Sequence, residues 1–197
     1  MEKHVLGLEL PTDPRWVDIA EKNISDILTD HAYCEQKAAT SGISLIVQFF
    51  DKERLVEALT PLVTEEWDHF GRVLDELKKR KLTLGPPRKD DYVDELNKLM
   101  KKGGNREQQL VEKLLMNAMI EARSCERFRL LWKEIKDEAL KNFYYELMVS
   151  EAGHYKSFLA LAKEYADPQE VHQRWHELLT LEAEIMKNLQ VRRDRMH

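Results

Sequence analysis

The chain has 197 residues, of which 43% are hydrophobic and 34% are charged, and its formal net charge is −5. With only 7 Gly and 6 Pro, this composition favours one core-forming, mostly helical domain. No apolar run approaches the ~18–20 residues of a membrane helix. Residues 1–10 carry charges in place of the apolar core of a signal peptide, so we expect a cytoplasmic protein. The two cysteines, Cys34 and Cys125, are too few for a Cys₄ metal site and are expected to be free thiols.

The predicted elements are all helices. Pro14 opens a short helix, and long helices are expected over about 25–50, 52–81, 106–132, 137–165 and 168–193, with Asp51 as the N-cap of the second. Residues 82–105 contain Gly85, Pro86 and Pro87 and predict a crossover with a short helix near 92–101. Because no strand-like alternation is present, we predict a single all-α domain over 1–197: a four-helix bundle with one long crossover and additional terminal helices.

Four of the long helices carry an apolar stripe with steps of three and four residues, which is typical of the buried seam of a bundle helix. Each stripe also contains an acidic residue: Glu35, Glu66, Glu121 and Glu151. His69 and His154 follow two of these residues by three positions, which places each histidine on the same helix face as its glutamate. The spacing from Glu35 to Glu66 nearly equals that from Glu121 to Glu151, so the chain reads as two similar helical hairpins.

These six residues predict a di-metal site. Four buried carboxylates would repel one another and cost several kcal/mol each unless cations compensate them. One Glu from each of two helices, with Glu-x-x-His from each of the other two, is the known ligand set of di-metal bundles. Oxygen and imidazole ligands suit iron or manganese, and the spacing does not choose between the two. Metal-bound histidines also need hydrogen-bond partners, and we expect Glu65 to reach His154, with Ser150 at the matching place on the other hairpin.

Positive charge is concentrated in one stretch of the sequence. Residues 78–106 contain ten Lys or Arg against four Asp or Glu, an excess of six positive charges in an acidic chain. Basic runs are most often solvated surface, but these lie together near the crossover and are candidates for phosphate contacts. The candidates are Lys78, Lys79, Arg80, Lys81, Arg88, Lys89, Lys101 and Lys102.

Four segments resemble the MiaE-type tRNA hydroxylases, which are similar to ferritins in fold. The segments are residues 31–39 (HAYCEQKAA), 65–70 (EEWDHF), 121–128 (EARSCERF) and 150–155 (SEAGHY), and the resemblance extends from about residue 16 to the end. It implies that Glu35, Glu66, His69, Glu121, Glu151 and His154 bind two iron ions. It also implies O₂ as co-substrate, an external electron donor or reductase, and hydroxylation of the isopentenyl group of 2-methylthio-N6-isopentenyladenosine in tRNA.

The expected chemistry suits the apolar residues of the stripes. A hydroxylase that oxidises a prenyl group needs a dry, apolar pocket beside its metal. Phe49, Leu62, Phe128, Leu147 and Phe158 are the candidates for its lining, although each would be buried in any bundle.

Three other functions compete with this one. A quinone or lipid hydroxylase would need an exposed membrane-binding helix, and charges on several faces of 168–193 disfavour that. A ferritin-like iron-binding protein without catalytic activity would assemble through extensive subunit interfaces. A rubrerythrin-like peroxidase is disfavoured because the chain lacks a Cys₄ centre.

Overall fold

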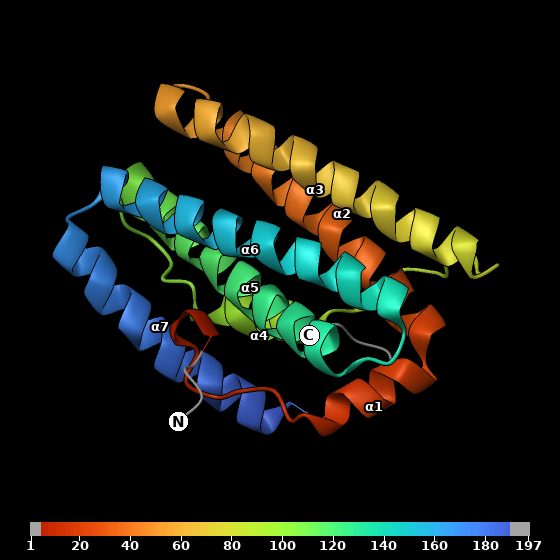
Figure 1. Cartoon of the computed structure of the whole chain (residues 1–197). Helices are drawn as coiled ribbons and strands as arrows, with labels where there is room; N and C mark the ends of the chain where they lie inside the picture. Colours follow the sequence, from red (N-terminus) through yellow and green to blue (C-terminus); the bar gives the residue numbers. More distant parts are fainter. Residues whose placement is uncertain (1–4, 190–197) are drawn as a thin grey trace. The chain divides into compact units, whose positions relative to one another are not determined.

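The computed structural model describes residues 5–189, and within that range the chain is entirely helical. It contains one 3-10 turn, Val5–Gly7, and seven α-helices, with no strand (Figure 1). The all-α prediction is therefore confirmed. The chain divides into two compact units, one of residues 18–89 and one of residues 5–17 with 90–189. Among the described residues, no helix has the length and apolar character needed to cross a membrane.

The unit of residues 18–89 is built on two long helices, α2 (Ile24–Gln48) and α3 (Glu53–Lys79), which pack side by side (Figure 1). Their apolar stripes are buried, as at Leu28 and Leu45 on α2 and at Leu59 on α3. The N-cap of α3 is Lys52, which makes no side-chain capping bond, so the prediction of Asp51 as the cap was wrong by one residue. The hairpin is therefore held by its stripe and not by a cap.

The crossover begins on this unit. Gly85 is attached to α2 at two points: its carbonyl accepts from the Tyr33 hydroxyl at 2.9 Å, and its N–H donates to Thr29 Oγ1 at 3.3 Å. The short helix predicted in the crossover is present as α4 (Asp91–Leu99). Its N-cap is Asp90, whose carboxylate accepts from the Val93 N–H.

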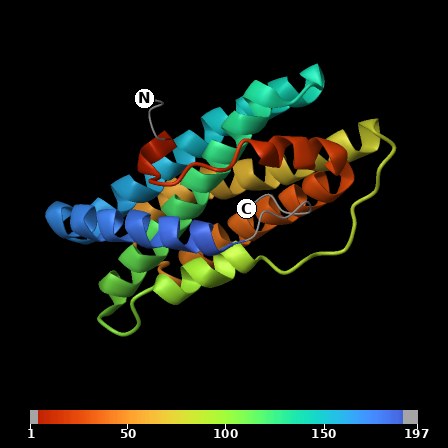
Figure 2. The same cartoon turned by 90° about the horizontal axis from the view of Figure 1, so that it is seen from below.

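The other unit is built on α5 (Arg106–Glu134) and α6 (Glu138–Tyr165), with α7 (Pro168–Asn188) and α4 packed alongside (Figure 2). All three long helices begin at a capping side chain, namely Asn105, Asp137 and Asp167. Helix α1 (Arg15–Lys22) crosses the boundary between the two units. The last predicted helix was expected to reach residue 193, but residues 190–197 lie outside the described part of the chain.

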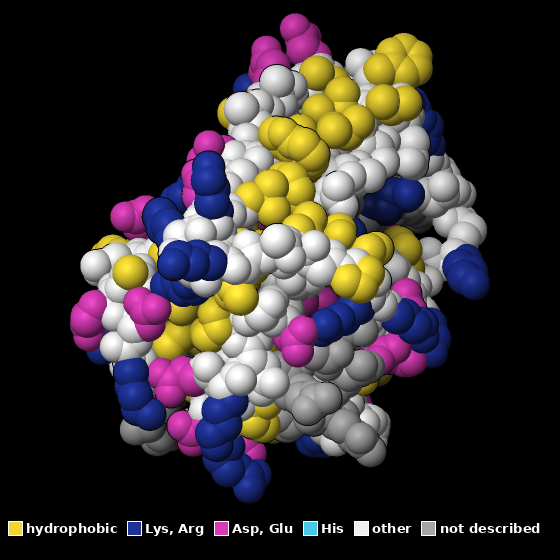
Figure 3. Space-filling model, turned by 90° about the vertical axis from the view of Figure 1, so that its right-hand side faces the viewer, with side chains coloured by type: hydrophobic (Ala, Val, Ile, Leu, Met, Phe, Trp, Pro, Cys, Tyr) yellow, Lys and Arg dark blue, Asp and Glu magenta, His cyan; other side chains and the backbone are white. Residues whose placement is uncertain are grey.

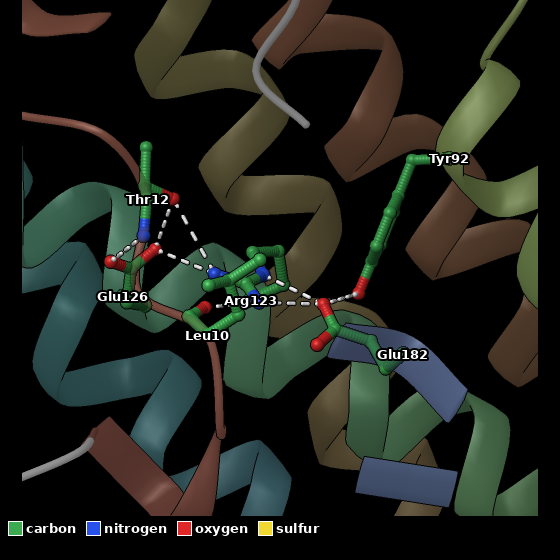
Figure 4. Close-up of polar contacts among 6 residues, drawn as sticks. All are labelled: Leu10, Thr12, Tyr92, Arg123, Glu126 and Glu182. Carbon is green, nitrogen blue, oxygen red and sulfur yellow. Dashed lines mark hydrogen bonds and ion pairs between the residues drawn. The ribbon is translucent and has the colours of Figure 1, made fainter. Parts of the chain in front are cut away.

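Arg123 is the centre of a buried polar network within this unit (Figure 4). Its Nη2 donates to Glu182 Oε1 on α7 at 2.6 Å and to the Leu10 carbonyl at 3.0 Å, and its Nη1 donates to Glu126 Oε2 at 3.1 Å. Thr12 donates to the Glu126 carboxylate from both its N–H and its hydroxyl. The network therefore joins the N-terminal segment and α7 to α5 through charge-assisted hydrogen bonds.

Candidate metal centre

The unit of residues 18–89 holds three of the six predicted metal ligands in one buried group. Glu35 lies on α2, and Glu66 and His69 lie one turn apart on the facing side of α3. One ligand atom from each residue lies within 4.8 Å of those of the other two. Nδ1 of His69 is 3.6 Å from Glu35 Oε2 and 3.9 Å from Glu66 Oε2. The imidazole nitrogen therefore faces both carboxylates.

The other unit repeats this arrangement with the remaining three ligands. Glu121 lies on α5, and Glu151 and His154 lie one turn apart on α6. All three are buried, and again one ligand atom of each lies within 4.8 Å of the others. Nδ1 of His154 is 3.4 Å from Glu151 Oε2. Each helix pair thus presents two carboxylates and one imidazole, as the pseudo-repeat in the sequence predicts.

Each group has the charge and spacing that a metal ion requires. Two bonds of ~2.1 Å that meet at a right angle or wider place their donor atoms ~3.0–4.2 Å apart, and the 3.6 Å between Glu35 Oε2 and His69 Nδ1 falls in that interval. Two buried carboxylates beside one imidazole leave negative charge that burial makes costly unless a cation balances it. Oxygen and nitrogen donors suit iron or manganese. The residues therefore fit a metal centre.

The histidines have further partners on the side away from Nδ1. Ser150 lies as predicted beside His154, with its hydroxyl oxygen 3.5 Å from Nε2. Glu65 Oε1 is 3.9 Å from Nε2 of His69 on its own helix, and its side chain is half exposed. The expected contact between Glu65 and His154 stays a prediction.

His31 is a functional candidate that the sequence reasoning missed. Its side chain is fully buried on α2, and its Nε2 lies 2.6 Å from Glu35 Oε1. The signal was present in the sequence, because His31 precedes the stripe residue Glu35 by four positions and so shares its helix face.

The predicted pocket residues are all in the core. Phe49 and Leu62 are buried in the unit of residues 18–89, and Phe128, Leu147 and Phe158 are buried in the other unit. Phe128 packs against Tyr144, with ring centroids 5.4 Å apart. Burial is what both core packing and a pocket lining require, so their role as a lining stays a prediction.

The basic residues form ion pairs that weaken several of them as phosphate ligands. Lys79 and Arg80 both pair with Glu76, Arg88 pairs with Asp26, and Lys101 pairs with Glu177. Lys78, Lys81, Lys89 and Lys102 are exposed. Figure 3 shows one face of the molecule, on which Lys and Arg side chains are interspersed with Asp and Glu.

A separate pocket of about 490 Å³ lies between the start of α5 and the start of α7, and Lys101 and Lys102 line it. On its wall, Arg174 makes two hydrogen bonds of 2.8 Å to the Glu112 carboxylate. None of the six predicted metal ligands lines this pocket.

Comparisons with known proteins agree with these features. The chain is 37% identical over 164 residues to a tRNA 2-(methylsulfanyl)-N(6)-isopentenyladenosine(37) hydroxylase of Pseudomonas putida, covering 83% of this chain and 78% of that protein. It is 28% identical over 206 residues to the protein of the same name from Salmonella typhimurium, covering 80% and 75%.

A solved structure, "Protein 43 with aldehyde deformylating oxygenase activity from Synechococcus", matches with a TM-score of 0.90 and 32% identity over 96% of this chain and 94% of that one. This likeness confirms the ferritin-like fold class. The family model of the tRNA-(MS[2]IO[6]A)-hydroxylases, MiaE, matches residues 1–197. The chain therefore belongs to the MiaE family of tRNA hydroxylases.

Proposed function

We propose that this chain is an O₂-dependent non-haem di-iron monooxygenase that hydroxylates the isopentenyl group of 2-methylthio-N6-isopentenyladenosine in tRNA. The two buried Glu–Glu–His groups, one on each helix pair, are the observation that carries the proposal. Membership of the MiaE family, whose curated relatives are named for this substrate, supports the choice of tRNA. The two units would work as one ferritin-like domain, in the cytoplasm where tRNA is found.

Six residues would hold the two iron ions. Glu35, Glu66 and His69 would contribute from α2 and α3, and Glu121, Glu151 and His154 from α5 and α6. When bound, a pair of iron ions supplies the capacity to activate O₂. One oxygen atom enters the C–H bond and the other leaves as water, so an external donor must supply two electrons and the solvent two protons.

The residues around the ligands exclude water and orient the histidines. Ser150 lies against Nε2 of His154, so Nδ1 faces Glu151. Phe128, Leu147 and Phe158 lie on the same two helices as Glu121, Glu151 and His154 and would offer a prenyl chain apolar contacts. An apolar, water-free lining also limits loss of the reactive oxidant to solvent.

The test is a tRNA hydroxylation assay. Iron-loaded protein, O₂ and a reductant are incubated with tRNA that carries the prenylated, methylthiolated base, and the digested nucleosides are analysed by mass spectrometry. We expect a gain of the mass of one oxygen atom on that nucleoside. The gain should be absent in Glu66→Ala and present in Glu57→Ala, because Glu57 lies exposed on the same helix.

A fatty aldehyde is the second substrate to include, because the solved structure that matches this chain carries aldehyde deformylating oxygenase in its title. Conversion of the aldehyde without change to the tRNA nucleoside would reject the tRNA substrate and keep the oxygenase. Two bound irons without conversion of either substrate would leave small prenylated compounds, quinones or lipids as the substrates, or iron binding alone.

A further inference from the structure

The two oxygens of Glu35 have different neighbours. Oε1 lies 2.6 Å from Nε2 of His31, one turn earlier on α2, and Oε2 lies 3.6 Å from Nδ1 of His69 on α3. Both histidines and the carboxylate are buried. One carboxylate oxygen is therefore occupied by an intrahelical contact while the other points at the metal-binding group.

The contact between His31 and Glu35 restrains the carboxylate strongly. An ionised carboxylate only accepts hydrogen bonds, so Nε2 of His31 carries the hydrogen and donates it. A hydrogen bond to an ionised acceptor is roughly twice as strong as a neutral one. Because the bond is made within one helix and away from water, it fixes the rotation of the Glu35 side chain before any metal binds.

The other helix pair has no histidine at the equivalent position. Asn117 precedes Glu121 by four residues on α5, and its amide nitrogen donates to the Lys113 carbonyl of the same helix at 2.8 Å. An imidazole at this position is therefore specific to the unit of residues 18–89, and its removal should act on one metal position.

We propose that His31 is a positioning residue that holds Oε1 of Glu35, so that Glu35 offers the metal a single oxygen, Oε2. The proposal rests on the di-iron site proposed above. It assigns His31 no contact with substrate and no proton transfer. Its effect is to pre-orient one ligand of one iron, which raises the affinity for that iron and sets its coordination as monodentate at Glu35.

The experiment compares two variants that fill the same space and differ in the hydrogen-bond donor. His31→Leu removes the donor, and His31→Gln keeps an amide N–H at a similar distance along the side chain. Metal-free proteins are titrated with ⁵⁷Fe(II), and iron per chain and Mössbauer spectra are recorded. We expect wild type and His31→Gln to bind two irons per chain. In His31→Leu, one of the two should bind ~10–100-fold more weakly, with an altered spectrum for that iron alone.

The controls separate this inference from the function on which it rests. A His172→Leu/His176→Leu variant removes the paired rings on the exposed face of α7, which could take up adventitious iron, and should leave both measurements unchanged. If His31→Leu fails to fold by circular dichroism, His31→Asn, whose amide is too short to replace Nε2, takes its place. Two irons with the wild-type affinity and spectrum in the folded donor-free variant would overturn the positioning role. Wild-type protein that binds fewer than two irons would instead overturn the di-iron site.

Discussion

Glu121 lies buried on α5 in a group with Glu151 and His154, where no described cation balances the two carboxylates. At the scale of single residues, this environment is unfavourable to the metal-free protein and favourable to the metal-bound one. A residue selected only for stability would not be a glutamate at this position, because a well-packed apolar side chain is often equal or better there.

For Glu121→Ala we therefore expect opposite effects on the two forms of the protein. The variant should stay helical, and its metal-free Tm should equal or exceed that of metal-free wild type, because a buried repulsion is removed. Iron should raise the Tm of wild type through binding linkage and should not raise that of the variant, which cannot retain the two ions. Circular dichroism melts with and without iron, together with metal analysis, measure both effects. Full iron loading of the variant would reject the ligand assignment.

The two cysteines are both free thiols but differ in environment, since Cys34 is partly exposed and Cys125 is buried. Burial is the largest cause that raises the pKa of Cys125 to about 12, and the carboxylates of Glu151 and Glu126 add to it. Only the thiolate reacts with an alkylating agent. At about pH 8 we expect iodoacetamide to label Cys34 first and to leave Cys125 unlabelled in the native protein, as peptide mass spectrometry would show. Equal labelling of both residues without denaturant would contradict the buried placement of Cys125.

At the scale of helices, the α2–α3 pair depends on a close approach at one glycine. A Cβ atom on Gly42 would lie 2.5 Å from Cγ2 of Val63 on α3. Val63 is β-branched and has one strongly preferred side-chain rotamer in a helix, so it cannot move aside easily. The position of α2 against α3, and with it the distance between Glu35 and His69, therefore requires a residue without a side chain at position 42.

Gly42→Ala should lower the free energy of unfolding by ~1–3 kcal/mol, because overpacking forces strain on a buried contact. Gly71→Ala is the matched control, since a Cβ there meets nothing within 4 Å and α3 is helical at that position. The control should be neutral or stabilising by up to ~1 kcal/mol through helix propensity. Urea unfolding of both variants gives the comparison, and a Gly42→Ala variant as stable as Gly71→Ala would contradict the close approach.

At the scale of the whole molecule, long-range ionic contacts hold the terminal segments in the unit built on α5 and α6. Arg123 is separated in sequence by 113 residues from Leu10 and by 59 from Glu182, and it bonds to both. Tyr92 on α4 also donates to Glu182 Oε1, at 3.2 Å. A single side chain therefore serves the N-terminal segment and α7, and Glu182 extends the network to α4 (Figure 4).

Arg123→Met should destabilise the protein by ~3–5 kcal/mol, because it leaves buried carboxylates without their partner. Arg54→Met, in an exposed pair with Glu57, should change stability by less than ~1 kcal/mol. Burial already raises the pKa of Glu182 above its usual 4.5, and the Arg123 guanidinium opposes this rise. A carboxyl whose folded pKa is raised contributes most below its unfolded pKa and loses that contribution as pH rises through the folded value. The Arg123→Met deficit should thus be smaller at about pH 5 than at about pH 8 in urea melts, and a deficit that grows toward acid would contradict this account.

Binding of tRNA is the second property that belongs to the whole molecule. Lys78 and Lys81 lie exposed at and just beyond the end of α3. If both contact phosphates, Lys78→Ala/Lys81→Ala should weaken tRNA binding and lower the slope of log affinity against log salt by about two. Lys187→Ala, in an exposed pair with Glu184, should leave that slope unchanged. Filter-binding titrations at several salt concentrations measure the slopes, and identical slopes in all three proteins would remove Lys78 and Lys81 from the tRNA contact.

The sequence by itself determined the all-α class, the bounds of the long helices to within a few residues, and the two ligand groups. The reason is that each of these depends on local periodicity: residues three or four apart share a helix face, so Glu66 with His69 and Glu151 with His154 could be paired without coordinates. The role of these residues as metal ligands still awaits the iron titrations.

The tertiary structure alone decided the contacts between residues distant in sequence. No local pattern marks Arg123 as the partner of Glu182 and Leu10, or Gly42 as the point of closest approach to Val63. Such contacts follow from how helices pack once their stripes are buried, and many packings share one periodicity. His31 lies between these cases: its spacing from Glu35 was visible in the sequence, but only the burial of both residues and the 2.6 Å contact show that the imidazole is directed at the carboxylate instead of at solvent.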